Sequence, residues 1–414
     1  MTSNARRKDD SEFYYLTDDA REKLKTYSYN GNDNSLLYHY VLAPLATFLV
    51  NTIVPKSMAP NTLTSIGLVF MITAYVAYWW YVPDLEAVHD VGEDSESFYP
   101  PRWIFLWNGI SILIYQTLDN MDGRQARRTG SSSPLGLLFD HGCDALNSIF
   151  GSINVIIGMD LSPSENLLEV WLLVFAPYFL FYIATWEQYL TGELIMPIIN
   201  GPSEGLVGTA LLSFTSYWNG SQYWQQTGIF DSLLSIPSFN AVAGDVKLRN
   251  CDLIVIAVSL GTLQEVLLKT AAVNLSGNGS TAGLFPMFAL AFCYLIIGYI
   301  DPNVWLAIPR TSLHLSMTLF VEMSTELMLA HTTAQSFLPW RWQLLPLFGI
   351  TFWVAAFGNS EGLQYVIIGY AYFMGAYLLI KVKYIIDEIC DVLEIWCFDI
   401  VTPHYRAVKK GTSK

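Results

Sequence analysis

Long apolar runs separated by polar stretches dominate the chain from residue 36 onward. A helix needs about 20 mostly apolar residues to cross a bilayer. The candidate runs lie at residues 38–55, 62–82, 103–120, 137–159, 167–186, 205–218, 251–273, 283–300, 312–334, 345–357 and 364–386. The intervening stretches 84–101, 219–250 and 274–281 are expected to be loops. The pattern therefore predicts an all-α polytopic membrane protein.

The basic residues indicate which runs cross the membrane. Lys and Arg clusters next to membrane spans favour the cytosol, and the densest clusters lie at residues 6–8, 124–128, 381–383 and 406–414. An even number of spans must then lie between the first two clusters, where three candidate runs occur. We assign the run 38–55 to the interface as an amphipathic helix, because it is short and carries polar residues. About ten transmembrane helices remain, with both termini in the cytosol.

A short amphipathic surface helix is also expected in the N-terminal segment, at residues 18–24. Thr17 or Asp18 can cap it, and its acidic residues precede its basic residues, as the helix dipole favours.

Composition narrows the class of protein further. Only 14% of the 414 residues are charged and 52% are hydrophobic, whereas soluble domains carry roughly 25% charged residues. A net charge of −14 offers no basic surface for nucleic acid. The five cysteines show no Cys-x-x-Cys spacing, so a disulfide framework or a zinc site is not supported.

Four of the few charged residues gather between the runs 103–120 and 137–159. Asp119 and Asp122 are three apart and Asp140 and Asp144 are four apart, so each pair shares one helix face. If the two helices pack as an antiparallel pair, the four carboxylates converge. Carboxylates in an apolar setting need a counter-charge, and oxygen ligands suit Mg²⁺ or Mn²⁺. We expect two such ions, bridged by shared carboxylates.

The same stretch carries residues suited to a phosphate ligand. Gly123 and Gly136 allow close approach of a helix or ligand, and the Arg127 guanidinium can bind phosphate oxygens with two hydrogen bonds. Residues 131–133 are expected to end one helix, and Pro134 to begin the next. A structural ion pair or a simple turn would explain any one of these residues. It would not explain all of them within 26 residues of a charge-poor chain.

The fixed positions of this stretch resemble the signature of the CDP-alcohol phosphotransferase family. They read Asp119-x2-Asp122-Gly123-x2-Ala126-Arg127-x8-Gly136-x3-Asp140-x3-Asp144. Segments around residues 15–35, 59–64, 186–192 and 200–205 resemble the eukaryotic choline/ethanolamine phosphotransferase branch. The chain departs from that branch at Leu137, Asn120 and Arg124, and none of these changes removes a motif carboxylate.

The resemblance implies a reaction and a set of partners. A CDP-aminoalcohol, CDP-choline or CDP-ethanolamine, and diacylglycerol would give phospholipid and CMP, the final step of the CDP-aminoalcohol pathway. The metal ions would be held by Asp119, Asp122, Asp140 and Asp144, while Arg127 stabilises charge. Gly123 would let the nucleotide lie close to the helix, and Asn61 would lie near the nucleotide. The resemblance also implies a homodimer in the endoplasmic reticulum, with the Golgi as an alternative and the active site facing the cytosol.

Two residues compete for the role of general base. His141 follows Asp140 directly, and its ordinary pKa suits proton abstraction near neutral pH. Asp144 is the base often assigned in the wider family, but a carboxylate that ligates metal is less basic. We favour His141. For the alcohol headgroup, Trp186, Glu187, Tyr189 and Glu204 are candidates, and an interfacial aromatic belt is an equally good interpretation of them.

These expectations divide the chain into four parts. They are a cytosolic N-terminal segment (1–37), a catalytic transmembrane core (38–220), additional transmembrane helices (221–400) and a basic cytosolic tail (401–414). Two alternative functions stay open: the same chemistry with another alcohol such as inositol, and transport of a divalent cation by the buried carboxylates.

Overall fold

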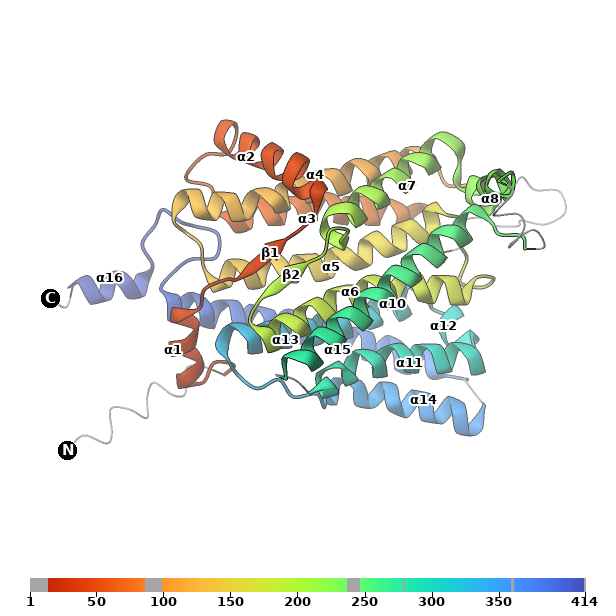
Figure 1. Ribbon diagram of the computed structural model, residues 1–414. Coiled ribbons are helices and arrows are strands. Elements are labelled where there is room, and N and C mark those ends of the chain that lie inside the picture. The colour runs from red at the N-terminus through yellow and green to blue at the C-terminus, as the bar shows by residue number, and fades with distance from the viewer. Residues whose placement is uncertain (1–13, 86–98, 237–245, 278–279, 359–360, 413–414) are drawn as a thin grey trace.

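The computed structural model describes residues 14–85, 99–236, 246–277, 280–358 and 361–412, and most of these residues are helical (Figure 1). Two three-residue strands, β1 (Gly31–Asp33) and β2 (Leu194–Met196), pair in parallel. The α-helices are α1 (Asp18–Thr26), α2 (Ala43–Thr52), α3 (Pro60–Tyr81), α4 (Trp103–Thr129), α5 (Pro134–Gly158), α6 (Leu167–Thr191), α7 (Leu206–Asn219), α8 (Gly228–Leu234), α10 (Asn250–Ser276), α11 (Phe285–Ile300), α12 (Asn303–Leu306), α13 (Pro309–Thr333), α14 (Leu345–Phe357), α15 (Leu363–Leu393) and α16 (Tyr405–Thr412).

The predicted apolar runs coincide with helices, which confirms the all-α membrane class. Each run from 62–82 onward lies on one of α3, α4, α5, α6, α7, α10, α11, α13, α14 and α15. Within the described residues, five helical segments are long and apolar enough to cross a membrane. The helices α4, α5 and α13 have 25 to 27 residues but carry many polar side chains. The number of crossings, about ten, stays a prediction.

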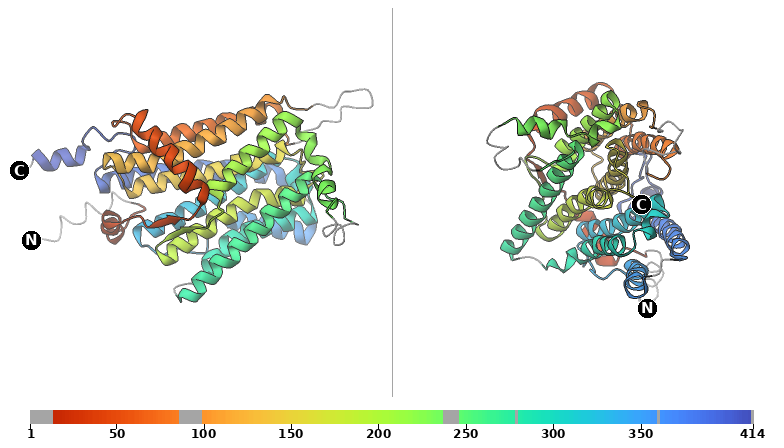
Figure 2. Two further views of the ribbon diagram at one scale, coloured as in Figure 1. Left: turned by 45° about the horizontal axis from the view of Figure 1, so that its top comes forward. Right: turned by 90° about the vertical axis from the view of Figure 1, so that its right-hand side faces the viewer.

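The two helices expected at the N-terminal side are both present. Thr17 caps α1, since its hydroxyl accepts a hydrogen bond from the Ala20 N–H at 3.3 Å. The run 38–55 forms a π-helical turn (Tyr38–Leu42) that continues into α2. In Figure 2, α2 crosses the neighbouring helices obliquely instead of running along them. That course fits the interfacial helix expected here.

One hydrophobic core joins the first and second halves of the bundle. Tyr178 of α6 stacks on Phe320 of α13, with ring centroids 4.3 Å apart, and α10 packs along α6. A buried ion-pair network ties α13 to α15: Glu322 accepts from Lys381 at 2.6 Å and also pairs with Arg341. This core contains residues from both sides of residue 220. The division of the chain into two parts at that residue therefore stays a prediction.

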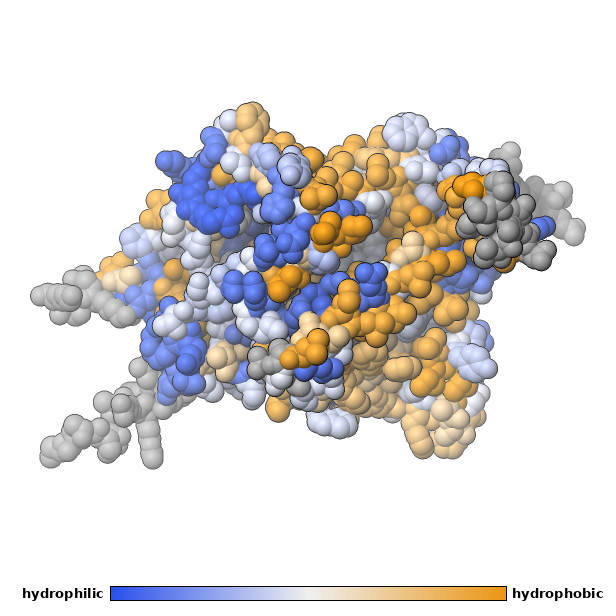
Figure 3. All heavy atoms as spheres, in the orientation of Figure 1, coloured by the Kyte–Doolittle hydropathy of each residue, from blue (hydrophilic) through white to orange (hydrophobic). Residues whose placement is uncertain are grey.

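Polar residues gather at one end of the molecule. Figure 3 shows hydrophilic side chains at the end that carries α1 and the C-terminal helix, and hydrophobic side chains along the flank formed by α7 and α10. We call the first region the polar end. The predicted basic residues 6–8 and Lys414 lie outside the described residues.

Candidate active site

The site is built on the turn between α4 and α5, at the polar end. Gly130 ends α4 in the left-handed conformation (φ 68°), which glycine adopts without steric cost. Ser133 then caps α5, since its hydroxyl accepts from the Gly136 N–H at 3.2 Å, and Pro134 occupies the first turn, as expected. The chain therefore turns back, and α5 runs antiparallel to α4 (Figure 1).

Three of the four predicted carboxylates converge. Asp119, Asp140 and Asp144 each offer an oxygen within 4.8 Å of the others. One buried oxygen of Asp119 and one of Asp140 have no hydrogen-bond partner among the described residues. A buried polar atom without a partner needs an explanation, and a cation held between the carboxylates would supply one here. The set of oxygen donors fits a hard divalent cation such as Mg²⁺ or Mn²⁺.

The fourth carboxylate lies beside this group and not in it. Asp122 accepts a hydrogen bond from the Thr64 hydroxyl of α3 at 2.5 Å. Tyr115 likewise donates its hydroxyl to Asp144 at 2.6 Å. Both hydroxyl groups orient carboxylates of the site. The sequence analysis assigns no role to either hydroxyl. Tyr115 lies one helical turn before Asp119, and this spacing is the signal that could have placed it at the site.

Arg127 is the arginine of this stretch that remains available to a ligand. Arg124 donates to the Asn120 carbonyl and to Thr47, and Arg128 donates to the carbonyls of Val50 and Val54. Arg127 is exposed and has no hydrogen-bond partner in the part of the chain that the structure describes. A Cβ placed on Gly123 would lie 3.5 Å from the Arg127 guanidinium, so the glycine widens the space beside it.

A loop from the C-terminal end also reaches the site. The Asn61 side-chain amide donates to the Cys397 carbonyl at 3.0 Å, and the Asn61 oxygen lies 3.7 Å from the Cβ position of Gly136. Phe398 packs against Phe139 of α5 edge to face, with centroids 5.4 Å apart. Sequence patterns do not predict this loop at the site, because more than 330 residues separate it from Asn61.

His141 occupies a different face of α5 from the converging carboxylates. Its ring meets the edge of Phe181 on α6, with centroids 6.2 Å apart. One residue further along a helix turns the side chain by about 100°, so His141 faces α6 while Asp140 faces α4. The imidazole therefore lies on the α6 side of Asp140, one residue away along the helix but on a different face.

The headgroup candidates make contacts within the protein. Trp186 is buried against Gly283, and Glu187 pairs with the buried ammonium of Lys269. The Tyr189 hydroxyl bonds to backbone groups of residues 335 and 337, and Glu204 accepts from two groups near the strands. These partners favour structural roles for all four side chains.

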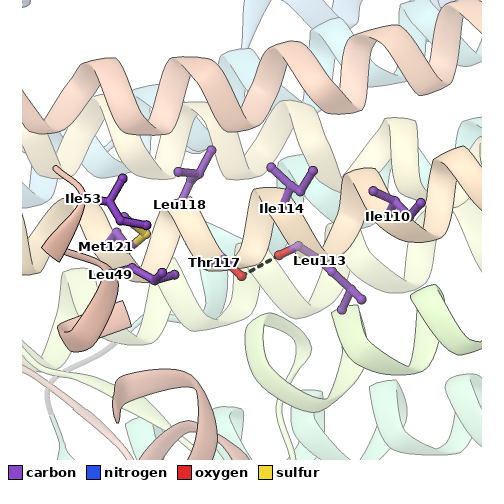
Figure 4. Close-up of a pocket in the computed structure, with 8 residues that line it drawn as sticks. All are labelled: Leu49, Ile53, Ile110, Leu113, Ile114, Thr117, Leu118 and Met121. Carbon is purple, nitrogen blue, oxygen red and sulfur yellow. Dashed lines mark hydrogen bonds between the residues drawn. The ribbon is translucent and has the colours of Figure 1, made fainter. Parts of the chain in front are cut away.

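An apolar groove lies on the opposite face of α4. Its volume is about 410 Å³. Figure 4 shows its lining side chains, Leu49, Ile53, Ile110, Leu113, Ile114, Thr117, Leu118 and Met121. Helical geometry places the α4 members of this set on the face turned away from Asp119. The groove therefore does not lead to the carboxylates.

Comparison with known proteins agrees with this geometry. The model of the family described as CDP-alcohol phosphatidyltransferase matches residues 57–196, which include every motif residue from Asn61 to Asp144. The chain is similar to choline/ethanolaminephosphotransferase 1 of Arabidopsis thaliana, 32% identical over 402 residues, covering 91% of this chain and 96% of that protein. Choline/ethanolaminephosphotransferase 2 of the same plant is 34% identical, covering 67% and 68%. Choline/ethanolaminephosphotransferase 1 of Saccharomyces cerevisiae is 29% identical, covering 70% and 72%.

Proposed function

Because the chain belongs to the CDP-alcohol phosphatidyltransferase family, we propose that it transfers phosphocholine or phosphoethanolamine from CDP-choline or CDP-ethanolamine to diacylglycerol. The products are phosphatidylcholine or phosphatidylethanolamine and CMP. The observation that carries this proposal is the group of three converging carboxylates, two of them with unpartnered buried oxygens. The exposed Arg127 lies about two turns beyond Asp119 along the same helix.

The carboxylates fit a divalent cation, so Asp119, Asp140 and Asp144 would hold Mg²⁺ or Mn²⁺, with Asp122 available for a second ion. A bound ion supplies positive charge that stabilises a diphosphate and its leaving phosphate. The Arg127 guanidinium, beside Gly123 on the same helix, would add two hydrogen-bond donors for phosphate oxygens. Thr64 and Tyr115 keep two of the carboxylates in place.

Proton transfer completes the reaction. The hydroxyl oxygen of diacylglycerol forms a bond to the β-phosphorus, the bond from that phosphorus to the oxygen of CMP breaks, and the hydroxyl proton moves to His141. His141 directly follows Asp140 on α5, and an imidazole has an ordinary pKa suited to proton abstraction near neutral pH. Asp144 is less suitable, because it accepts from Tyr115 and belongs to the carboxylate group.

The polar end is expected to face the cytosol, where the CDP-alcohol is dissolved, while diacylglycerol arrives from the bilayer. The endoplasmic reticulum, or the Golgi, is the expected compartment, and a homodimer is expected from the resemblance. Cross-linking in native membranes and immunolocalisation test these two predictions.

A panel of substrates tests the function. Purified protein in Mg²⁺ is given diacylglycerol with CDP-choline or CDP-ethanolamine, and separately CDP-diacylglycerol with inositol. We expect CMP from the first reactions and none from the last. CMP from inositol alone would favour the alternative alcohol, and cation uptake by proteoliposomes without any nucleotide would favour a transporter.

A further inference from the structure

The N-terminal residues 14–38, which we call the strap, lie outside the region matched by the family model and cross the polar end of the bundle (Figure 1). Leu16, Ala20 and Leu24 are each at most 3% exposed. They belong to one hydrophobic cluster with Leu135 of α5 and Ile389 of α15. The strap is therefore packed against the catalytic helix and against the last transmembrane helix.

A carboxylate from the far end of the chain holds the start of the strap. Glu388 of α15 is buried and accepts hydrogen bonds from three consecutive backbone N–H groups, those of Tyr14 (2.6 Å), Tyr15 (3.0 Å) and Leu16 (3.0 Å). Hydrogen bonds to an ionised acceptor are roughly twice as strong as neutral ones. This single side chain therefore fixes the position at which the strap begins.

The other end of the strap is fixed by strand pairing and by side chains. β1 pairs with β2, and Asp33 accepts from the Asn200 amide at 3.0 Å. Ser35 is fully buried and donates to Glu204 at 2.5 Å. The last strap residue, Tyr38, accepts a hydrogen bond from Arg124 of α4 at 3.3 Å, so the strap runs from the first turn of α5 to the motif segment of α4.

Tyr29 lies in this middle part. Its ring folds over Gly31, where a Cβ would lie 2.2 Å from the Tyr29 hydroxyl, so a larger residue there would displace the tyrosine. Half of the side chain is exposed. Burial, with a smaller contribution from the Asp140 carboxylate, raises the pKa of Tyr29 to about 12, and Arg127 opposes this rise. The hydroxyl therefore stays protonated near neutral pH and can donate a hydrogen bond, and it belongs to the part of the strap between the Leu135 contact on α5 and the Arg124 contact on α4.

We propose that the strap forms a wall of the CDP-alcohol site, that the Tyr29 hydroxyl binds the diphosphate of the substrate, and that Glu388 is the positioning residue that holds the strap. This inference rests on the proposed function. In this proposal a residue of the second half of the chain, Glu388, contributes to substrate binding from outside the region that the family model matches.

The test compares Glu388→Ala, Glu388→Gln and Tyr29→Phe with Asp387→Asn. Asp387 is an exposed neighbour on the same helix and pairs with Lys383 at 2.5 Å, so it serves as the matched control. We expect Glu388→Ala to raise the KM for the CDP-alcohol about tenfold or more, as loss of charge-assisted hydrogen bonds implies. The KM for diacylglycerol should change less than about twofold, because the proposed strap contact is with the diphosphate of the other substrate. Glu388→Gln keeps one acceptor oxygen, so its KM for the CDP-alcohol should lie between the values of the wild type and of Glu388→Ala.

A double-mutant cycle and proteolysis sharpen this test. Tyr29→Phe should raise the same KM in the wild-type background but not in Glu388→Ala, because the released strap no longer places the hydroxyl. Trypsin should cleave at Lys23 and Lys25 of α1 faster in Glu388→Ala than in Asp387→Asn, and this readout does not depend on activity. The inference is overturned if cleavage is unchanged, if both substrates lose affinity equally, or if the two substitutions act additively. A wild-type protein inactive with both CDP-alcohols would refute the proposed function, whereas faster cleavage would still support the anchoring role of Glu388.

Discussion

Replacing Tyr115 by phenylalanine removes one oxygen atom and tests whether the hydroxyl groups around the carboxylates matter. Tyr115 is 1% exposed and donates to Asp144 at 2.6 Å. The aromatic ring stays, so packing is preserved and no large cavity forms. The change leaves one carboxylate oxygen of Asp144 without its donor in a place that water does not readily reach.

The size of the effect follows from this hydrogen bond. A hydrogen bond to a charged group contributes about 1.5–3 kcal/mol, and removing a side chain that orients a metal ligand lowers metal affinity by about 10–100-fold. We expect Tyr115→Phe to raise the Mg²⁺ concentration needed for half-maximal activity within that range. Saturating Mg²⁺ should restore most of the turnover, because the reacting groups themselves are unchanged.

The assay is the rate of CMP release as a function of Mg²⁺, together with direct Mn²⁺ binding. Tyr178→Phe is the matched control: Tyr178 is also buried, and its hydroxyl bonds to Ser316 at 3.2 Å, away from the carboxylates. It should leave the metal dependence unchanged. The reasoning fails if Tyr115→Phe shows the metal dependence of the wild type, or if both variants shift it equally.

Three further predictions concern charge and proton transfer. Arg127→Ala should lower kcat/KM by about 100-fold through lost charge stabilisation, with little change in thermal stability. Arg128→Ala removes hydrogen bonds to the carbonyls of Val50 in α2 and Val54 just after it, so it should mainly lower stability. Equal effects of the two variants on kcat/KM and on the melting temperature would contradict this. Lys381→Met should lower the free energy of unfolding by about 3–5 kcal/mol, because it leaves the buried Glu322 without one of its partners. Thermal melts in detergent check this, with Lys383→Met at an exposed position as the control. An unchanged melting temperature in Lys381→Met would contradict the prediction. His141→Gln should reduce turnover by about 10²–10⁴-fold while Mn²⁺ binding is kept; near-normal turnover would make Asp144 the base.

Much of the fold could be predicted because hydrophobic length and helical spacing are local properties. The apolar runs located the long helices, and Pro134 and the short α4–α5 connection fixed the antiparallel pair that carries the aspartates. The interfacial helix followed from the parity of crossings between basic clusters. These inferences need no knowledge of distant contacts.

The parts that the sequence did not reveal depend on contacts between distant residues. The bond from Thr64 to Asp122 joins two helices, and no spacing rule predicts which helix packs beside α4. Asn61 meets the loop at Cys397, and Glu388 meets the strap, because the second half of the bundle folds back onto the first. Glu187 is a headgroup candidate in the sequence because its partner is not visible there. That partner, Lys269, is 82 residues away along the chain.

The central claim is that the carboxylates between α4 and α5 bind the metal that permits phosphoryl transfer to a lipid hydroxyl. The most direct measurement follows CMP and phospholipid formed by purified protein from CDP-choline or CDP-ethanolamine and diacylglycerol, with and without Mg²⁺, in the wild type and in Asp140→Asn. We predict equal amounts of the two products in the wild type with Mg²⁺, and neither product without the ion or in the variant. CMP without phospholipid, or undiminished transfer by Asp140→Asn, would contradict the account.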